Sequence, residues 1–434
     1  MNNSSHQQAS ALHQALIDQL KQNIPEFILT SKIEEAFRAV PRHLFLPDLP
    51  LDQVYRDDAI VTKKEGETAL SSSSQPGVMV AMLSQLGLEP GHHVLEIGSG
   101  TGYNAALLSY LVGETGKVTT VDLDEDTVES ARNHLTEAGF GQVEVICADG
   151  GYGYKGSAPY DRIIVTAGAV EISPGWREQL KPGGRIVAPL AILPGGRQMS
   201  ICFELNDSCL VSISLVSCGF MMLRGAFSSA AAAEDREVQF GPEPGLLLHF
   251  KADDPRKVDP EAIYKLLTGP SKDLPTGVTV HSHELVGKFF LWSKLLRIDK
   301  DYRDFSCGLA AHGELADHGI VPYLFGLAGK YCSTSGLLKE DSIAVWMRPP
   351  GHALPQEWPK EDMPFELCVR GYGPDLSLAE LLVERARNWN AAGRPPKGVR
   401  VRAYAKESDY TPSENEIVVE RQHTRFVIEL GVNQ

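Results

Sequence analysis

The chain has 434 residues, of which 43% are apolar and 22% are charged, a composition typical of a globular protein with room for two packed cores. Its formal net charge of −15 disfavours extended contact with nucleic acid, because neutralising phosphates requires clustered Lys and Arg side chains. We therefore expect no nucleic-acid partner.

The sequence also gives no sign of a membrane protein or a metal centre. No apolar run reaches the roughly 18 residues that a membrane span needs. Asp18, Lys21 and Glu26 occupy the region where a signal peptide would need an apolar stretch. The seven cysteines are scattered and never spaced as Cys-x-x-Cys, which favours free thiols over disulfides or zinc. We expect a cytoplasmic protein with no membrane partner and no metal.

The predicted elements begin with a short amphipathic helix. Ser31-Lys32-Ile33-Glu34 has the form of a capping box, and Pro41 ends the helix. From residue 94 onward, short apolar runs alternate with polar helical stretches. The runs predict strands at Val94–Ile97, Val118–Val121, Val143–Cys147, Ile163–Val165 and Ile186–Ala188, and the stretches predict helices through Leu107–Leu111, from Asp126 to Ala138 and near Trp176–Leu180. This alternation predicts an α/β fold with a doubly wound, mostly parallel sheet.

The pattern changes past Cys218, and a stretch of small residues follows at Ser228–Asp235. We predict a first domain at 1–225, a linker at 226–239 and a smaller α+β accessory domain at 240–434 that recognises the substrate or acts as a lid. In the accessory domain, Ser377 is the expected cap of an amphipathic helix that ends at Gly393, and Val399–Ala403 and Ile417–Leu430 are expected strands.

A glycine-rich turn follows the strand Val94–Ile97 and opens the next helix. Such a turn lets the backbone approach a ligand closely, and the helix N-terminus supplies unpaired N–H groups. The spacing Gly98-x-Gly100-x-Gly102 differs from the Gly-x-Gly-x-x-Gly of dinucleotide binders. Glu96 lies just before the turn, where its carboxylate suits a ligand that carries an ammonium group and would repel a pyrophosphate.

Acidic residues also end the next two strands. Asp122 is placed to accept both hydroxyls of a ribose at the carboxyl ends of the strands, and Asp149-Gly150 is placed to meet an adenine amino group. Acids that only capped helices would not explain this series. We therefore predict S-adenosylmethionine as cofactor and S-adenosylhomocysteine as its product. The predicted cofactor-binding residues are Glu96, Gly98, Ser99, Gly100, Gly102, Asp122, Leu123, Asp149 and Gly150.

Four further segments carry a more specific pattern, namely Val40-Pro41-Arg42-His43-Leu44-Phe45, Ser74-Gln75-Pro76, Tyr160–Ala169 and Leu180–Arg185. They resemble the Val-Pro-Arg-x-x-Phe, Ser-x-Pro, Phe-Asp-x-Ile-Ile-Val-Thr-Ala and Leu-x-x-Gly-Gly segments of the protein-L-isoaspartate (D-aspartate) O-methyltransferase family. The resemblance covers about residues 30–225. It implies a Rossmann-like fold and methyl transfer to a carboxylate of an Asp or isoaspartyl residue in a protein or peptide.

The resemblance also implies roles for residues outside the glycine turn. Ser74 is the expected catalytic residue, whose hydroxyl orients the acceptor carboxylate. The expected substrate-binding residues are Ser73, Gln75, Pro76 and Thr166. The serine run Ser71–Ser74 leaves the register open among Ser72, Ser73 and Ser74, although Gln75-Pro76 favours Ser74.

Other readings stay open at this point. Gly219–Gly225 replaces the family's usual Phe-Val-Pro-Leu ending, and the long extension after it resembles that of members that methylate an aspartate in ribosomally made, modified peptides. The acceptor is then either an isoaspartyl residue in damaged protein or an aspartate in a dedicated peptide, whose ester closes to a succinimide. From other classes, an NAD-dependent dehydrogenase would share the sheet and Asp122, and a non-catalytic scaffold would share the cofactor site.

Overall fold

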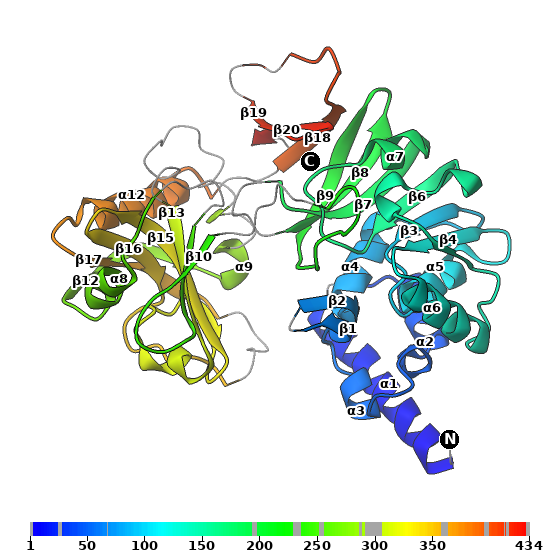
Figure 1. Cartoon of the computed structure of the whole chain (residues 1–434), viewed down its shortest axis with the longest axis horizontal. Helices are drawn as coiled ribbons and strands as arrows, with labels where there is room; N and C mark the ends of the chain where they lie inside the picture. The colour runs from blue at the N-terminus through cyan, green and yellow to red at the C-terminus, as the bar shows by residue number, and fades with distance from the viewer. Residues whose placement is uncertain are drawn as a thin grey trace. The chain divides into compact units, whose positions relative to one another are not determined.

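The structure is a computed structural model, and its elements are labelled in Figure 1. It describes residues 3–24, 28–66, 68–192, 198–228, 236–250, 256–285, 289–290, 306–356, 363–394, 399–411, 413 and 416–430. The described chain forms two compact units. Unit 1 takes its residues from Met1–Ile192, Gly196–Ser229 and Arg400–Ile428, and unit 2 takes its residues mainly from Ala230–Val399.

Unit 1 is built on a ten-stranded sheet with the order β19-β20-β18-β9-β8-β7-β6-β3-β4-β5. The five strands from β7 to β5 are parallel to one another. They are β3 (His93–Ile97), β4 (Lys117–Asp122), β5 (Glu144–Cys147), β6 (Tyr160–Val165) and β7 (Leu180–Leu190). Every one of them overlaps a strand predicted from the sequence, and the α/β fold class is confirmed.

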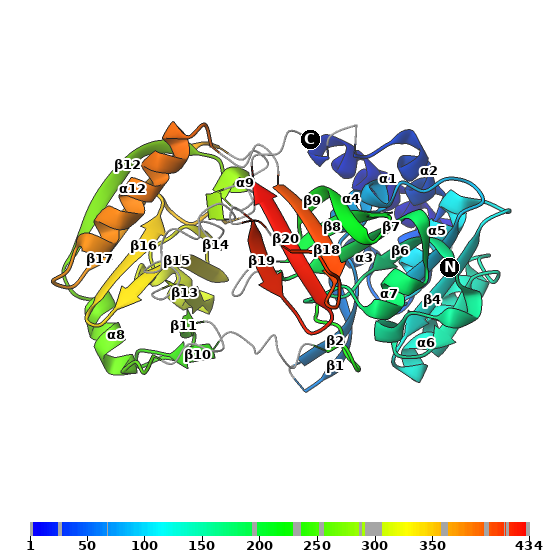
Figure 2. The same cartoon turned by 90° about the horizontal axis from the view of Figure 1, so that it is seen from above.

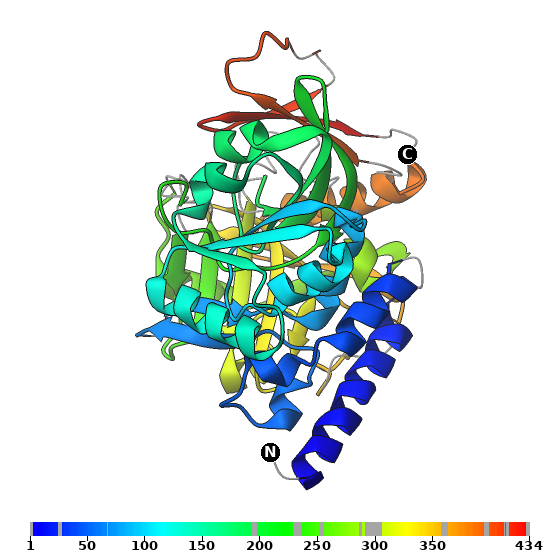
Figure 3. The same cartoon turned by 90° about the vertical axis from the view of Figure 1, so that its right-hand side faces the viewer.

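The helices of unit 1 precede or connect these strands. They are α1 (Asn3–Asn23), α2 (Ser31–Ala39), α3 (Leu51–Val54), α4 (Pro76–Leu86), α5 (Tyr103–Val112), α6 (Glu125–Glu137) and α7 (Pro174–Glu178). Figure 3 shows the long α1 with the N-terminus at its end. The helix predicted near Trp176–Leu180 is α7, which ends at Glu178. Leu180 is instead the first residue of β7, and that strand includes Lys181–Gly184.

The predicted capping box at the start of α2 is wrong by one residue. The cap is Thr30, whose Oγ1 accepts a hydrogen bond of 3.4 Å from the amide of Ile33. Glu34 therefore lies one position too late for a capping box. Its carboxylate instead binds Arg38 at 2.7 Å and Lys21 at 3.1 Å.

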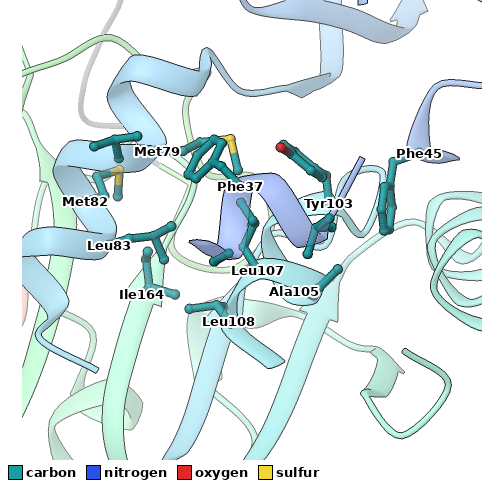
Figure 4. Packing of buried hydrophobic residues seen from close by; sticks show 14 of the residues in the cluster. Phe37, Phe45, Met79, Met82, Leu83, Tyr103, Ala105, Leu107, Leu108 and Ile164 are labelled. Atoms are coloured by element: carbon teal, nitrogen blue, oxygen red, sulfur yellow. The ribbon is translucent and has the colours of Figure 1, made fainter. Parts of the chain in front are cut away.

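One hydrophobic core lies between the helices α2, α4, α5 and α6 and the strands of the sheet. Figure 4 shows Phe37 of α2, Met79 and Met82 of α4, and Tyr103 of α5 converging in it. Phe37 and Tyr103 are at most 2% exposed, and their rings meet edge to face at 6.2 Å. Burial of such large side chains contributes about 1.5–3 kcal/mol each, so this core fixes α4 and α5, whose N-termini carry the serine and glycine segments.

The sheet continues beyond β7 through antiparallel strands. They are β8 (Met199–Asn206), β9 (Cys209–Ser217), β18 (Val399–Ala405), β20 (Thr424–Leu430) and β19 (Ile417–Glu420). Figure 2 shows β18, β20 and β19 beside β9. A separate hairpin of β1 (Ile60–Glu65) and β2 (Thr68–Ser73) precedes α4.

The strands predicted at Val399–Ala403 and Ile417–Leu430 exist, but their expected place in the accessory domain is wrong. β18 pairs with β9, so that Ala403 lies opposite Leu210. The turn before β20 is held by the preceding part of unit 1: Arg421 donates to the carbonyl of Ile192 at 2.7 Å, and the Thr424 hydroxyl donates to that of Ile172 at 2.7 Å. The final strands are therefore part of unit 1.

A chain ending at Val399 is expected to lower the thermal midpoint of unit 1 by roughly 10 °C or more, because β9 loses its partner strand at the cost of several kcal/mol. Calorimetry with and without added cofactor identifies the transition of unit 1. A chain ending at Leu430, which keeps all three strands, is the control. An unchanged midpoint in the chain ending at Val399 would contradict this prediction.

Unit 2 contains an antiparallel sheet of eight strands. The strands are β10 (Arg236–Gln239), β11 (Leu246–Phe250), β12 (Ser271–Val280), β13 (Ser306–His312), β14 (Phe325–Leu327), β15 (Tyr331–Lys339), β16 (Ser342–Met347) and β17 (Phe365–Tyr372). Its helices include α8 (Pro260–Leu267), α9 (Ser282–Glu284) and α12 (Ser377–Ala391).

Two details of unit 2 differ from the prediction. β10 falls inside the predicted linker at 226–239, whose residues 229–235 lie outside the described residues. The cap of α12 is Leu376 instead of Ser377, because Asp375 already accepts the amide of Ser377 at 2.9 Å. The apolar face of α12 is as predicted, with Leu382, Ala386 and Trp389 fully buried.

Candidate active site

A pocket opens at the carboxyl ends of β3, β4 and β6, entirely within unit 1. It encloses about 840 Å³ of space that no atom fills, part of which is open solvent at its mouth. Its lining combines the serine segment, the glycine turn, two strand ends and a late segment of unit 1. The lining residues include Leu70–Ser74, Glu96–Thr101, Asn104, Asp122, Leu123, Gly150, Thr166 and Met221–Arg224.

The glycine turn has the conformation that its residues suggested. Gly98, Gly100 and Gly102 have φ of +100°, +50° and +87°, values that favour glycine. Space is also limiting at Gly98, since an added Cβ would lie 2.5 Å from Oγ1 of Thr166. Gly98 and Gly100 line the pocket, whereas Gly102 caps α5 and lies outside the lining.

Glu96 is fully buried at the end of β3 and lines the pocket. Its carboxylate accepts hydrogen bonds from Asn104 Nδ2 at 2.7 Å and from the Thr120 hydroxyl at 2.6 Å. The Thr120 oxygen lies 2.9 Å from that of Ser99. Burial raises the pKa of Glu96 to about 7, because removing a carboxylate from water penalises its charged form. The two hydrogen bonds lower the pKa, but by less than burial raises it.

No cation pairs with Glu96 among the described residues. A buried carboxylate without a counter-ion is costly, and an ammonium group on a ligand in this pocket would supply the missing charge. The residues therefore fit the aminoacyl end of S-adenosylmethionine. Nothing comparable favours a pyrophosphate at this position, since the same carboxylate would repel it.

Asp122 and Leu123 line the pocket at the end of β4. The Asp122 carboxylate accepts the amides of Gly100 at 3.1 Å, Leu123 at 2.8 Å and Asp124 at 3.4 Å. A carboxylate has about four acceptor positions, so it retains capacity for a ribose hydroxyl. Asp122 thus also fastens the glycine turn to β4.

The structure divides the predicted pair Asp149-Gly150. Gly150 lines the pocket, but Asp149 lies outside the lining. The Asp149 carboxylate accepts the amides of Gly151 at 2.9 Å and Ala226 at 2.7 Å. It therefore ties the end of β5 to the segment that follows Arg224.

The serine segment separates into side chains with different surroundings. Ser73 is 3% exposed, and its hydroxyl lies 3.3 Å from the guanidinium of Arg42. Ser74 lines the pocket, and its hydroxyl has no hydrogen-bond partner within the described part of the chain. Gln75 and Pro76 form the start of α4 and lie outside the lining.

Thr166 lies at the end of β6, and its hydroxyl is within 2.9 Å of the carbonyls of both Ile97 and Gly98. Its side chain therefore holds the glycine turn. The turn is in this way fixed from β4 by Asp122 and from β6 by Thr166.

Three charged residues near the pocket were not predicted as site residues. Arg224 lines it and binds Asp124 through two hydrogen bonds of 3.1 and 2.7 Å. Lys63 of β1 also binds Asp124, at 2.8 Å. The Arg224 hydrogen bonds, more than Lys63, hold the pKa of Asp124 down at about 2. Asp124 thereby joins the β1–β2 hairpin to the wall Met221–Arg224.

The comparisons with known proteins cover the part of the chain that contains this pocket. The family model for protein-L-isoaspartate(D-aspartate) O-methyltransferase matches residues 11–225. A protein-L-isoaspartate O-methyltransferase of Methanopyrus kandleri is 41% identical over 165 residues, which are 38% of this chain and 71% of that protein. The chain belongs to the protein-L-isoaspartate(D-aspartate) O-methyltransferase family.

Coverage of other members of this family varies. A protein-L-isoaspartate O-methyltransferase of Thermotoga maritima is 39% identical over 189 residues, which are 43% of this chain and only 59% of that protein. A solved structure with the same name has 24% identity and a TM-score of 0.49, covering 97% of this chain and all of that one. The family match ends at residue 225, so it contains neither unit 2 nor the strands β18–β20.

No helix in the described part of the chain is both long and apolar enough to cross a bilayer.

Proposed function

We propose that the chain is an S-adenosylmethionine-dependent O-methyltransferase that esterifies a carboxylate of an aspartyl or isoaspartyl residue in a protein or peptide. The observation that carries the proposal is the buried, uncompensated carboxylate of Glu96 beside the glycine turn, in a chain of this family. A complex of another family protein with S-adenosyl-L-homocysteine agrees with this cofactor.

The acceptor needs orientation more than activation. When bound, S-adenosylmethionine would supply a sulfonium methyl group: an oxygen of the acceptor carboxylate would bond to the methyl carbon as the carbon–sulfur bond breaks, giving a methyl ester and S-adenosylhomocysteine. The acceptor carboxyl is already ionised near neutral pH, so no residue has to remove a proton. Ser74 donates its free hydroxyl to the acceptor carboxylate and holds it in line.

Two acceptors are candidates: an aspartate in a dedicated peptide and an isoaspartyl residue in damaged proteins. Unit 2 and β18–β20 lie outside the family match, which favours a dedicated peptide over damaged proteins in general. In that case the amide nitrogen after the methylated aspartate displaces methanol and closes a succinimide. Unit 2 then serves to recognise the peptide or to cover the site.

The test uses the full chain with labelled S-adenosylmethionine and matched peptides that contain isoaspartate, aspartate or asparagine at one position. We expect label in the isoaspartyl or aspartyl peptide, none in the asparaginyl peptide, and binding of S-adenosylmethionine but not of NAD. Cofactor binding without transfer to either acid would contradict the enzyme and favour a scaffold. Mass spectrometry follows the ester: later loss of methanol indicates ring closure, and a stable methyl gain counts against it.

A further inference from the structure

We propose that Arg42 and Asp57 are positioning residues that together fix the main chain on both sides of Ser74. The inference rests on the proposed function, because it assigns these two residues a purpose through the hydroxyl of Ser74. Neither residue lines the pocket, so each would act only through the segment Ser73–Gly77.

Arg42 binds this segment from one side. It is 0% exposed and lies in the short helix Arg42–Phe45. Its Nη2 donates to the carbonyl of Ser74 at 3.0 Å and lies 3.3 Å from the hydroxyl of Ser73. The remaining contacts are with the carbonyl of Ser73 at 3.4 Å and with the carbonyls of Val54, at the end of α3, and of Arg56 and Asp58 after it, at 3.0 to 3.1 Å.

The contacts of Arg42 are unusual for a buried cation. Among the described residues, its six hydrogen bonds all go to backbone carbonyls or a hydroxyl, and no carboxylate forms an ion pair with the guanidinium, although the charges of Asp57 and Asp58 favour its cationic form. Burying a charge without an ionised partner is expensive unless several hydrogen bonds compensate it. The planar fork of Arg, with five donors, can join two loops at once, whereas Lys cannot. Arg42 therefore fastens the loop 54–58 to the carbonyls just before α4.

Asp57 binds the same segment from the other side. Its Oδ1 accepts the amide of Gly77 at 2.7 Å. The cap residue Gln75 makes no side-chain cap, and Pro76 has no N–H, so Asp57 supplies the missing acceptor at the start of α4. The fit is close, since a Cβ added to Gly77 would lie 3.0 Å from the Asp57 carboxylate.

Ser74 lies between these two attachments. Its own carbonyl is held by Arg42, and the amide three residues later is held by Asp57. The hydroxyl of Ser74 is the part of this segment left free for the pocket. A displacement of about 1 Å can lower the rate of an aligned reaction a hundredfold. Attaching the main chain on both sides of Ser74 therefore affects the rate of methyl transfer as well as the stability of the fold.

The test compares Asp57→Ala with Asp58→Ala. Asp58 is the neighbouring exposed carboxylate, and it contacts Arg42 only through its carbonyl. For Asp57→Ala we expect kcat on the acceptor peptide to fall about tenfold or more, with KM and the Kd of S-adenosylmethionine within about threefold of wild type. Asp58→Ala should stay within about twofold in all three.

The double variant Asp57→Ala with Ser74→Ala separates positioning from folding. If Asp57 acts through Ser74, the double variant is no slower than Ser74→Ala alone, because coupled residues are not additive. An additive loss, or equal losses in Asp57→Ala and Asp58→Ala, would overturn the proposal. Arg42→Lys should behave as Asp57→Ala does, with a larger fall in thermal midpoint.

Hydrogen exchange on the full chain tests the attachment without any activity. In Asp57→Ala the amides of 73–77 should exchange faster, and those of Gly98–Gly102 should not change. Unchanged exchange at 73–77 would overturn the proposal even in an active enzyme. Conversely, if the wild-type chain transfers no methyl group, the proposed function fails while faster exchange still supports the attachment itself.

Discussion

Replacing Ser74 with Ala is expected to lower kcat by about tenfold to a hundredfold while the Kd of S-adenosylmethionine stays nearly constant. A hydrogen bond to a charged acceptor contributes about 1.5–3 kcal/mol, and each 1.36 kcal/mol of barrier is a factor of ten. Ser74 makes no other side-chain hydrogen bond within the described residues, so its loss should not disturb the fold. Steady-state kinetics and calorimetric binding measure the two effects separately.

The other serines are the matched controls for Ser74. Ser72 also lines the pocket, so Ser72→Ala should leave turnover within about threefold of wild type if Ser74 holds the acceptor. Ser73→Ala should mainly lower stability, because its hydroxyl contacts buried Arg42. Near-normal turnover in Ser74→Ala would remove Ser74 from the mechanism, and a loss confined to Ser72→Ala would move the role to Ser72.

The sheet of unit 1 was predictable where strands that follow one another in the sequence also lie side by side in the sheet. Strands such as Val94–Ile97 and Ile163–Val165 are buried on both faces, so each reads as a short apolar run between helices. The connections through α5, α6 and α7 make β4 parallel to β3, β5 parallel to β4 and β7 parallel to β6, whereas the pairing of β6 with β3 joins strands that are not consecutive in the sequence. These local signals are enough to predict the carboxyl ends of β3 and β4 and the side chains they carry.

The placement of β18 was not predictable in the same way. Its alternating pattern indicates a strand, but the pattern is equally satisfied by a partner in unit 2 or in unit 1. The observed partner, β9, precedes it by almost two hundred residues. Sequence periodicity specifies which face of a strand is buried and leaves the neighbouring strand undetermined.

Some residues of the site were likewise predictable from local sequence, and others were not. Glu96, Asp122 and the glycine turn were found because each follows a strand directly. Arg224 was missed because its partner Asp124 is a hundred residues away, and a contact at that distance leaves no spacing in the sequence. The segment Gly219–Gly225 differs from the family pattern, but that difference alone does not indicate a pocket wall.

Replacing Glu96 with Gln is expected to weaken binding of S-adenosylmethionine about tenfold to a hundredfold. Removing the charge of one partner in a buried ion pair costs on the order of 2 kcal/mol or more of binding free energy. A loss of about 2 kcal/mol raises Kd about thirtyfold. The hydrogen bonds from Asn104 and Thr120 remain only in part, since an amide has one acceptor oxygen. Calorimetry on both proteins near pH 8 measures the difference, and Asp126→Asn, on the exposed start of α6, is a charge-matched control.

The same variant should be more stable than wild type when no cofactor is present and the pH is high. Folding raises the pKa of Glu96 from 4.5 to about 7, so between these values the folded state holds a proton that the unfolded state has released. Stability of the wild type therefore falls as pH rises from about 4.5 to about 7, by at most about 3 kcal/mol, and stays low above that. Glu96→Gln should lack this fall, so its advantage appears at pH 8 and vanishes near pH 4.5.

Cofactor binding should show the opposite pH dependence, because an ammonium group favours the ionised form of Glu96. Affinity of the wild type should rise with pH up to about 7, by no more than tenfold per pH unit, while that of Glu96→Gln stays flat. Thermal midpoints without cofactor and Kd values, each measured from pH 5 to 8, test both trends on the same proteins. If the two proteins share one pH profile in both measurements, Glu96 is neither the buried acid that the fold must accommodate nor the counter-ion of the cofactor.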